Sequence, residues 1–341
     1  MTIARFIVSQ VGPLVTVQDG GRPRLMRFGV TESGPMDRGS FAVANIALGN
    51  KAAAPGIEIS MGGLSLECVE GNVTFAVAGG GFHVTLDQVS FGSWCVATLR
   101  PGSRLVIKPG HWGSWAYLAF AGAFQANTWL GSASTHGPSG FGGGKLAAGQ
   151  TLVVDNAEVR EERNGEIPCP VSARPRNSVR VVLGPQDRFF ARESIELLLS
   201  ETFTLTDAYD RMGVRLRGPS LKPSSRLDMP SEAIARGSIQ VSGDGVPTVL
   251  LADHQTTGGY PKIATIISDD LDGFVQLRPR NRVAFTSITP EAAIQTTRTH
   301  RHTYEQFLAS LQDRARPLAL KLNSVNLIDG VTSASSQIDR L

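Results

Sequence analysis

Cysteine and histidine are scarce in this chain, and their spacing excludes several kinds of site. The 341 residues include three cysteines, Cys68, Cys95 and Cys169, which are far apart and odd in number. This spacing fits neither a disulfide framework nor a metal or redox motif and indicates reduced thiols. Six histidines are scattered, and Arg301 separates His300 from His302, which would face opposite sides of a strand. We therefore predict no metal site.

Long apolar runs and a strong charge imbalance are also missing. No apolar run approaches the roughly 20 residues of a membrane helix, so we predict no membrane association. The net charge is only +3, and no basic stripe with interleaved aromatics occurs, which argues against nucleic acid as a partner. The N-terminal residues do not resemble a signal peptide, and we expect a cytoplasmic protein.

The familiar nucleotide and nucleophile motifs are absent as well. The glycine-rich run from Gly137 to Lys145 resembles a phosphate loop, but Ser139 replaces its first glycine and Leu146 its Ser or Thr. We interpret this run as a structural turn, with an anion-binding nest of backbone amides as the alternative. No serine occupies a nucleophile elbow, and no biotinylation motif occurs.

Glycine and proline, by contrast, are plentiful and evenly spread. Thirty-seven glycines and nineteen prolines separate short apolar runs, most regularly between residues 56 and 154. This pattern is typical of a β-barrel or β-sandwich, so we predict a mainly β fold with a few short helices. Helical spacing is limited to residues 37–48, 191–200 and a tail from about residue 303. The charged, proline-bearing segment 155–178 is the best linker candidate.

The second half of the sequence repeats the first weakly but in order. Asp37-Arg38 matches Asp210-Arg211, and further matches join Gly63 to Gly237 and Gly71 to Gly245, separated by 173 to 174 residues. Such ordered matches indicate an internal duplication. We therefore predict a first β-barrel unit over residues 1–165, a second over 166–300, and a helical and polar tail over 301–341.

One turn in the second repeat carries most of the chemistry. Residues 253–262 (DHQTTGGYPK) lie between two apolar runs, which predicts strand, polar turn, strand. Their counterpart in the first repeat is Gly79-Gly80-Gly81-Phe82, which is almost bare glycine. Polar groups held on glycine-hinged turns between rigid strands are a common way of building a site. An ordinary solvated loop is the alternative.

The predicted site combines this turn with polar residues at other strand ends. Lys262 and Tyr260 can donate to a developing oxyanion, and Asp253 or His254 can move protons. Arg22 or Arg211 can pair with a substrate carboxylate. Helix caps, turn-closing hydrogen bonds or structural ion pairs explain several of these residues equally well. The predicted substrate-binding residues are Gln18, Asp19, Arg22, Asp37, Asn45, Glu58, Arg211, Gln255, Thr256, Thr257, Gly258 and Gly259.

These same segments make the chain resemble a known family. Four segments resemble the allophanate hydrolase subunit 2 family, also called the biotin-dependent carboxyltransferase family. They are VTVQDGGRPRLMRFGVTESGPMDRGSFAVANIALGN, GIEISMGG, YDRMGVRLRG and ADHQTTGGYPKIATIISDDL. Its members include the C subunit of bacterial 5-oxoprolinase and the carboxyltransferase region of urea carboxylase. The resemblance runs from about residue 14 to about residue 290. It implies two cyclophilin-like β-barrel units and a separate subunit 1 partner, and allows a further lactam-utilisation subunit.

The resemblance leaves three functions open. The first is a subunit of an ATP-dependent 5-oxoprolinase that opens a small cyclic amide to glutamate, with ATP bound elsewhere or at an unfamiliar site. The second is the acceptor half of a carboxyltransferase that uses carboxybiotin carried on another protein, with urea or a similar amide as acceptor. The third is a regulatory or binding subunit without catalysis of its own.

Overall fold

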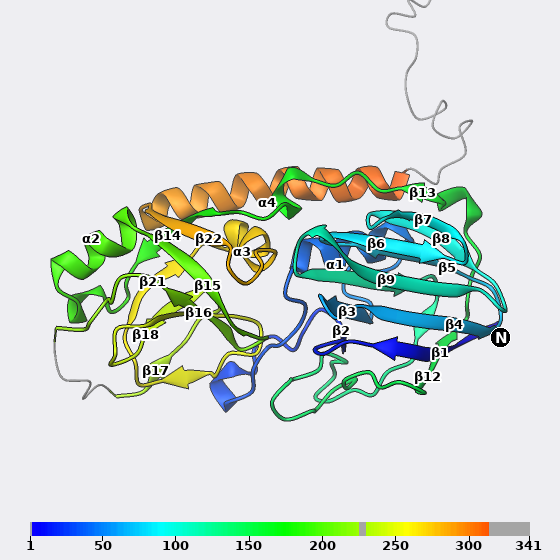
Figure 1. Ribbon diagram of the computed structural model, residues 1–341, viewed down its shortest axis with the longest axis horizontal. Helices are drawn as coiled ribbons and strands as arrows, with labels where there is room; N and C mark the ends of the chain where they lie inside the picture. The colour runs from blue at the N-terminus through cyan, green and yellow to red at the C-terminus, as the bar shows by residue number, and fades with distance from the viewer. Residues whose placement is uncertain (1, 225–229, 314–341) are drawn as a thin grey trace, which may run out of the picture.

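The computed structural model describes residues 2–224 and 230–313. Within them the chain forms two β-rich units side by side, with one long helix, α4 (Pro290–Asp313), running across both (Figure 1). The predicted mainly β class with few helices is confirmed. No described helix is both long and apolar enough to cross a membrane.

The first unit contains two sheets rather than one closed barrel. The seven-stranded sheet has the order β11 (Ala123–Phe124), β12 (Thr151–Asp155), β1 (Ile3–Val11), β4 (Leu64–Glu70), β9 (Arg104–Trp112), β6 (Gly81–Leu86) and β7 (Val89–Gly92). The six-stranded sheet has the order β13 (Gly165–Glu166), β8 (Cys95–Leu99), β5 (Val73–Ala78), β10 (Trp115–Phe120), β3 (Gly56–Ser60) and β2 (Thr16–Gln18). Every residue of β3, β5 and β10 is buried, as expected of strands covered on both faces.

The second unit is a closed seven-stranded barrel. Its strand order is β14 (Ser178–Leu183), β21 (Lys262–Ile266), β18 (Ser238–Val241), β19 (Pro247–Leu250), β16 (Gly213–Arg217), β15 (Thr202–Tyr209) and β22 (Arg282–Ser287). Parallel pairing of β22 with β14 closes the ring. The short pair β17 (Glu232–Ala233) and β20 (Thr257–Gly258) lies outside it.

The predicted helices form with small shifts. α1 (Arg38–Ala47) begins after Asp37, whose Oδ1 accepts the Ser40 amide hydrogen at 2.8 Å, so the predicted helix over 37–48 is confirmed. α2 (Arg192–Ser200) confirms the second prediction. α4 starts well before residue 303, so His300 and His302 lie on a helix and their assignment to a strand is wrong. The sequence pattern did not reveal α3 (Ser268–Val275).

The predicted linker is partly built into the first unit. β13 pairs with β8, and two 3-10 helices, η2 (Glu161–Arg163) and η3 (Val171–Ala173), occupy the same segment. The chain thus crosses back along the first unit before β14 begins the barrel (Figure 1).

The predicted duplication finds partial support in backbone conformation. Gly63, Gly71, Gly237 and Gly245 all have positive φ, and each matched pair precedes a strand at corresponding places. However, β18 pairs directly with β19, whereas β4 and β5 belong to different sheets. The duplication and the two unit boundaries therefore stay predictions.

Candidate functional site

The centre of the molecule is a buried ion cluster that joins the two units. Arg211, only 2% exposed, donates from Nε to Asp253 Oδ2 at 2.9 Å and from Nη2 to Asp253 Oδ1 at 3.0 Å. Its Nη1 donates to Glu58 Oε1 on β3 of the first unit. Nη2 also donates to the Gly34 carbonyl at 2.8 Å. All three nitrogens of this guanidinium are therefore engaged inside the protein.

The two carboxylates of the cluster are satisfied in turn. Glu58 Oε2 accepts the Met36 amide at 2.6 Å and the Tyr117 hydroxyl at 3.1 Å. Asp253 Oδ2 also accepts the Gly137 amide at 2.9 Å. Burial would raise the pKa of Asp253, but the charge and hydrogen bonds of Arg211 lower it below its ordinary value.

These contacts revise three predicted roles. Arg211 uses four of its five N–H donors on Asp253, Glu58 and Gly34 and is buried, which argues against a substrate carboxylate as its partner. Asp253 has a lowered pKa and a bidentate partner, which makes it a poor proton acceptor. Glu58 is fully buried, so neither a solvent-facing position nor direct substrate contact fits it. These contacts favour a structural role between the units, and the predicted catalytic and substrate-binding roles of these residues stay predictions.

Arg22 differs from Arg211 in having free donors. It is 2% exposed, its Nη2 donates to the Ser134 carbonyl, and its guanidinium lies 4.9 Å from the centre of the Trp129 ring. Its Nε and Nη1 are buried without a hydrogen-bond partner in the described structure. Burial lowers the pKa of Arg22, while Asp19 and Asp253 oppose this shift. An incompletely paired buried guanidinium is a ready partner for a carboxylate.

Asp19 and Gln18 hold the loop that carries Arg22. Asp19 Oδ1 accepts the hydroxyls of Ser132 and Ser134, each at 2.6 Å, and Oδ2 accepts the Ala133 amide at 2.7 Å. Gln18 Nε2 donates to Thr16 Oγ1 at 2.9 Å. The bonds of Asp19 fit a turn-closing role that positions Arg22. Gln18 Oε1 is buried without a hydrogen-bond partner among the described residues, so substrate contact by Gln18 stays a prediction.

The predicted strand, turn, strand arrangement of 253–262 is confirmed. β19 ends at Leu250 and β21 begins at Lys262, with the short β20 between them. Gln255, Thr256, Gly258 and Gly259 are partly buried, and Thr257 is exposed. Gln255 Nε2 donates to Gln240 Oε1 at 3.3 Å, and Gln240 Nε2 donates to the Tyr260 carbonyl at 3.1 Å. Gln240 on β18 therefore links Gln255 and Tyr260 and holds the turn against the barrel.

His254 is buried in a state suited to accepting a proton. Its Nδ1 lies 2.6 Å from the Gln255 carbonyl oxygen, which can only accept a hydrogen bond. Nδ1 therefore carries the proton, which leaves Nε2 as the basic nitrogen. Burial lowers the pKa of His254, so the neutral ring predominates near pH 7. The Thr31 hydroxyl fixes its backbone by donating to the His254 carbonyl at 3.0 Å.

Lys262 is the most unusual group of the turn. Its side chain is 1% exposed, and its Nζ has no hydrogen-bond partner in the part of the chain that the structure describes. Burial lowers the pKa of Lys262, and Glu232 partly offsets this. The Lys262 amide donates to Gln186 Oε1 at 2.9 Å, and Gln186 Nε2 donates to Glu232 Oε2 at 2.5 Å. An unpaired buried amine is costly and is characteristic of functional sites.

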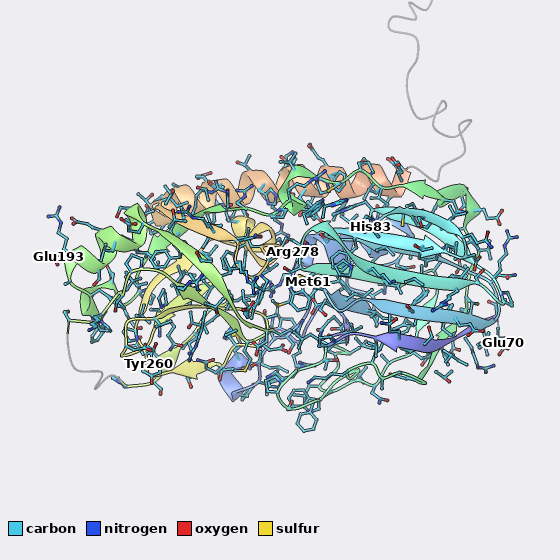
Figure 2. The ribbon with its side chains drawn as sticks, viewed as in Figure 1. Met61, Glu70, His83, Glu193, Tyr260 and Arg278 are labelled. Atoms are coloured by element: carbon cyan, nitrogen blue, oxygen red, sulfur yellow. The ribbon has the colours of Figure 1, made fainter. Side chains whose placement is uncertain are left out.

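Tyr260 lies apart from this buried set. Its side chain is 46% exposed and it sits at the outer edge of the second unit (Figure 2). A hydrogen bond from its hydroxyl to a substrate would need a ligand or a partner chain at the surface.

Asp37 and Asn45 belong to α1 and not to the turn. Asp37 Oδ2 accepts Ser40 Oγ at 2.6 Å and Gln276 Nε2 at 2.7 Å. Asn45, near the opposite end of α1, donates to the Ala54 carbonyl at 3.0 Å. These bonds fit the capping and turn-closing roles that are the alternative to substrate binding, and the predicted substrate contacts stay predictions.

The glycine-rich run 137–145 is a packed structural turn, as predicted. The Gly137 amide is used by Asp253, and Gly142 approaches Ser134 so closely that a Cβ would lie 2.2 Å from its carbonyl oxygen. The Gly140, Gly143 and Gly144 amides also donate within the protein, which argues against a phosphate cradle for ATP at this place.

Several supporting residues were not found from the sequence. Gln276 Oε1 accepts the Ser114 and Trp115 amides at 3.0 and 3.2 Å and joins the units. Gln186 accepts the Lys262 amide hydrogen and donates to Glu232, and the Ser134 carbonyl accepts from Arg22. Single polar residues of this kind have no spacing signal, because their partners lie far away along the chain.

Comparison with known proteins identifies the family. Residues 28–287 match the model described as carboxyltransferase domain, subdomain A and B. The chain belongs to this family. It is 34% identical to the C subunit of 5-oxoprolinase from Haemophilus influenzae, covering 83% of this chain and 91% of that protein. Identity to the C subunit of 5-oxoprolinase from Escherichia coli is 32%, covering 88% and 96%.

Other relatives of this carboxyltransferase-domain chain are larger. A putative urea carboxylase of Emericella nidulans is 30% identical, covering 91% of this chain but 26% of that protein. The crystal structure of Kluyveromyces lactis urea carboxylase superposes with a TM-score of 0.79 at 27% identity, covering 90% of this chain and 29% of that one. A crystal structure of TTHA0988 gives a TM-score of 0.75 at 33% identity, covering 84% of this chain and 56% of that one.

Proposed function

We propose that this chain is a subunit of an ATP-dependent 5-oxoprolinase-type amidohydrolase. The observation that carries the proposal is the length of the matches: the alignments cover 91% and 96% of two 5-oxoprolinase C subunits but only 26% of a urea carboxylase. The substrate would be a five-membered lactam with one carboxylate. Its ring amide, activated by phosphorylation, would be opened by water to give glutamate.

Arg22 suits the substrate carboxylate. Its Nε and Nη1 are buried and unpaired among the described residues, which is the donor arrangement that a carboxylate satisfies. The Trp129 ring packs on the guanidinium and limits its movement. Because Arg211 is already engaged, we assign carboxylate binding to Arg22 alone.

Lys262 and His254 suit the reacting amide. The unpaired Nζ of Lys262 can donate to negative charge that develops on the ring oxygen. His254 Nε2, left basic by the hydrogen bond at Nδ1, can accept a proton from the attacking water. Tyr260 would contribute from the surface once a partner chain covers it.

ATP and the remaining subunits lie outside this chain in the proposal. The glycine-rich run does not fit a nucleotide, so we assign ATP binding to another chain. The expected partners are a subunit 1 protein and a lactam-utilisation subunit, in keeping with two relatives that are named as the C subunit of 5-oxoprolinase.

A second function has a specific observation in its favour. The family model and the urea carboxylase structures share this fold, which supports carboxyl transfer from carboxybiotin on another protein. In that case Lys262 would donate to the ureido oxygen of biotin. A regulatory role without catalysis is the third possibility.

Reconstitution separates the three functions. The purified chain is mixed with its subunit 1 and lactam-utilisation partners and supplied with ATP and 5-oxoproline, and glutamate is measured. A parallel mixture contains a biotin carboxylase, a biotinylated carrier protein, ATP, bicarbonate and urea, and carboxylated urea is measured. We expect glutamate release in the first mixture only. Turnover in the second mixture alone would establish carboxyl transfer. If turnover does not need this chain, its role would be regulatory.

A further inference from the structure

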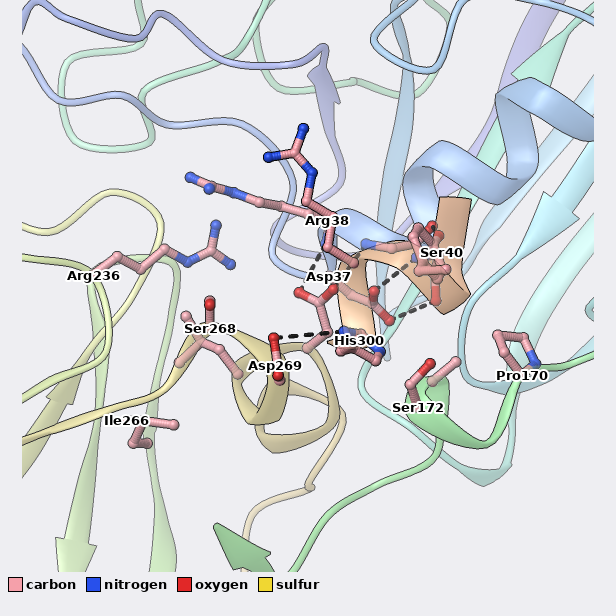
Figure 3. A pocket seen from close by; sticks show the side chains of 16 residues that line it. Asp37, Arg38, Ser40, Pro170, Ser172, Arg236, Ile266, Ser268, Asp269 and His300 are labelled. Atoms are coloured by element: carbon pink, nitrogen blue, oxygen red, sulfur yellow. Dashed lines mark hydrogen bonds and ion pairs between the residues drawn. The ribbon is translucent and has the colours of Figure 1, made fainter. Parts of the chain in front are cut away.

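A cavity lies between the two units, beneath α4, and none of the residues 253–262 lines it. Its volume is about 370 Å³, and it is lined by the start of α1, by η3, by α3 and by α4. Figure 3 shows Asp37, Arg236, Asp269 and His300 arranged around it. This volume falls in the lower part of the range typical of small-molecule sites.

Two groups of opposite charge in this lining each have one atom without a hydrogen-bond partner among the described residues. Asp269 is 9% exposed; its Oδ1 lies 3.5 Å from His300 Nδ1, but its Oδ2 is buried without a hydrogen bond among the described residues. Arg236 donates from Nη1 to the Pro35 carbonyl at 3.1 Å and from Nη2 to the Met36 carbonyl, while its buried Nε has no partner there. Each orphan is costly unless a ligand satisfies it.

Two further carboxylates, Asp272 and Asp37, lie on the acidic side of the cavity. Asp272 accepts the Arg38 and Gly39 amides at 3.1 and 2.9 Å, and Asp37 is buried beside it. Burial and Asp272 raise the pKa of Asp37 to about 7, and burial also raises the pKa of Asp269. At Asp269 burial outweighs the opposing effects of His300, Arg180 and Thr297, so a further cation near this carboxylate would be favourable.

The other two arginines of the lining do not supply that cation. Arg38 pairs with Glu32 at 2.9 Å and its side chain is 54% exposed. Arg301 pairs with Glu305 at 2.9 Å and is 78% exposed. Both charges are satisfied outside the cavity, which leaves Arg236 as the cationic group beside the acidic side.

We propose that this cavity binds a small zwitterion of the α-amino acid class. The ammonium group would lie against Asp269, and the carboxylate would accept from Arg236 Nε. Leu271, Ile266 and the Tyr304 ring supply an apolar wall for an aliphatic side chain. Because the lining comes from both units and α4, the ligand would hold them together. The proposal is independent of the function assigned to the turn.

Three matched probes test the ligand class by isothermal titration calorimetry on the full chain. L-leucine carries both charges, 3-methylbutylamine only the ammonium, and 4-methylpentanoate only the carboxylate. We expect saturable binding of L-leucine and at least about tenfold weaker binding of the other two. Equal binding of the amine and L-leucine, or no binding of L-leucine into the millimolar range, would overturn the proposal.

Two variants test the place of binding. Asp269→Asn keeps the size of the side chain and should weaken L-leucine binding about tenfold or more. Ser172→Phe fills the cavity without removing a charge and should abolish binding even if Asp269→Asn folds poorly. Glu291→Gln, at an exposed position near the start of α4 and outside the lining, is the matched control and should bind as the wild type does. Undiminished binding by Ser172→Phe would contradict the assignment.

Discussion

Arg211 and Asp253 form a two-point ion pair, with Nε 2.9 Å from Oδ2 and Nη2 3.0 Å from Oδ1. The third nitrogen of the same guanidinium reaches Glu58 in the first unit. One side chain of the barrel thereby fixes the start of the 253–262 turn and ties it to β3. The turn is rigid at this end because its first residue is held at a fixed distance from the other unit.

Replacing Arg211 should therefore destabilise the whole chain. Arg211→Met keeps most of the side-chain volume but leaves the Asp253 and Glu58 carboxylates buried without a cation. We expect the free energy of unfolding to fall by about 3–5 kcal/mol, as measured by urea denaturation.

Arg192→Met provides the control for that experiment. Arg192 is 89% exposed and pairs with Glu196 on the surface of α2, so its loss should change stability by less than about 0.5 kcal/mol. Equal effects of the two substitutions would show that the central cluster contributes no more than a surface pair.

Lys262 should be required for turnover but not for folding. Lys262→Met removes an unpaired buried amine, so stability should stay the same or increase. Glutamate release by the reconstituted assembly should fall about a hundredfold or more, since the developing oxyanion loses a donor. Lys51→Met, at an exposed lysine, is the control. A destabilised Lys262→Met protein with normal turnover per folded molecule would assign Lys262 a structural role.

Arg22 should act on substrate binding more than on the chemical step. Arg22→Met removes the two unpaired donors, and KM for 5-oxoproline should rise about 10- to 100-fold with a smaller change in kcat. Pyrrolidinone is the same ring without the carboxylate and should be a poor substrate. Its kcat/KM should be the same for the wild type and for Arg22→Met. A comparable loss with pyrrolidinone would place Arg22 elsewhere than on the carboxylate.

Asp37 should make stability fall as pH rises through neutrality. Its pKa is raised from the ordinary 3.8 to about 7, so the folded chain binds a proton that the unfolded chain releases. This contribution is present at low pH and lost as pH rises through about 7, which amounts to about 1 kcal/mol between pH 6 and pH 8. Urea denaturation of the wild type and of Asp37→Asn should show this difference. An identical pH slope in both proteins would contradict it.

Sequence patterns predicted the positions of strands and helices in this fold but not how the strands pair. Glycine-bounded apolar runs located the strands, and Asp37 marked the start of α1, because both signals are local. The arrangement of the first unit as two sheets was not predicted, since it depends on pairings such as β4 with β9 that no local pattern encodes. α3 was missed because it begins directly after Ile267, whose apolar side chain gives no capping signal at the start of the helix.

The candidate site, which stays a prediction, was also proposed from a local signal. The density of polar groups in 253–262 identified the turn, but not which of them are already paired within the protein. Arg22 and Arg211 look alike in the sequence, yet Arg211 meets two carboxylates and Arg22 meets a carbonyl and an aromatic ring. Only the three-dimensional partners distinguish a structural arginine from one with free donors.

The most direct test of the central claim is the rate of ATP-dependent glutamate release from 5-oxoproline by the assembly reconstituted with and without this chain. We predict that the wild-type chain restores turnover and that Lys262→Met, incorporated to the same extent, does not. Equal glutamate release with the wild-type chain, with Lys262→Met and with no added chain would contradict the account.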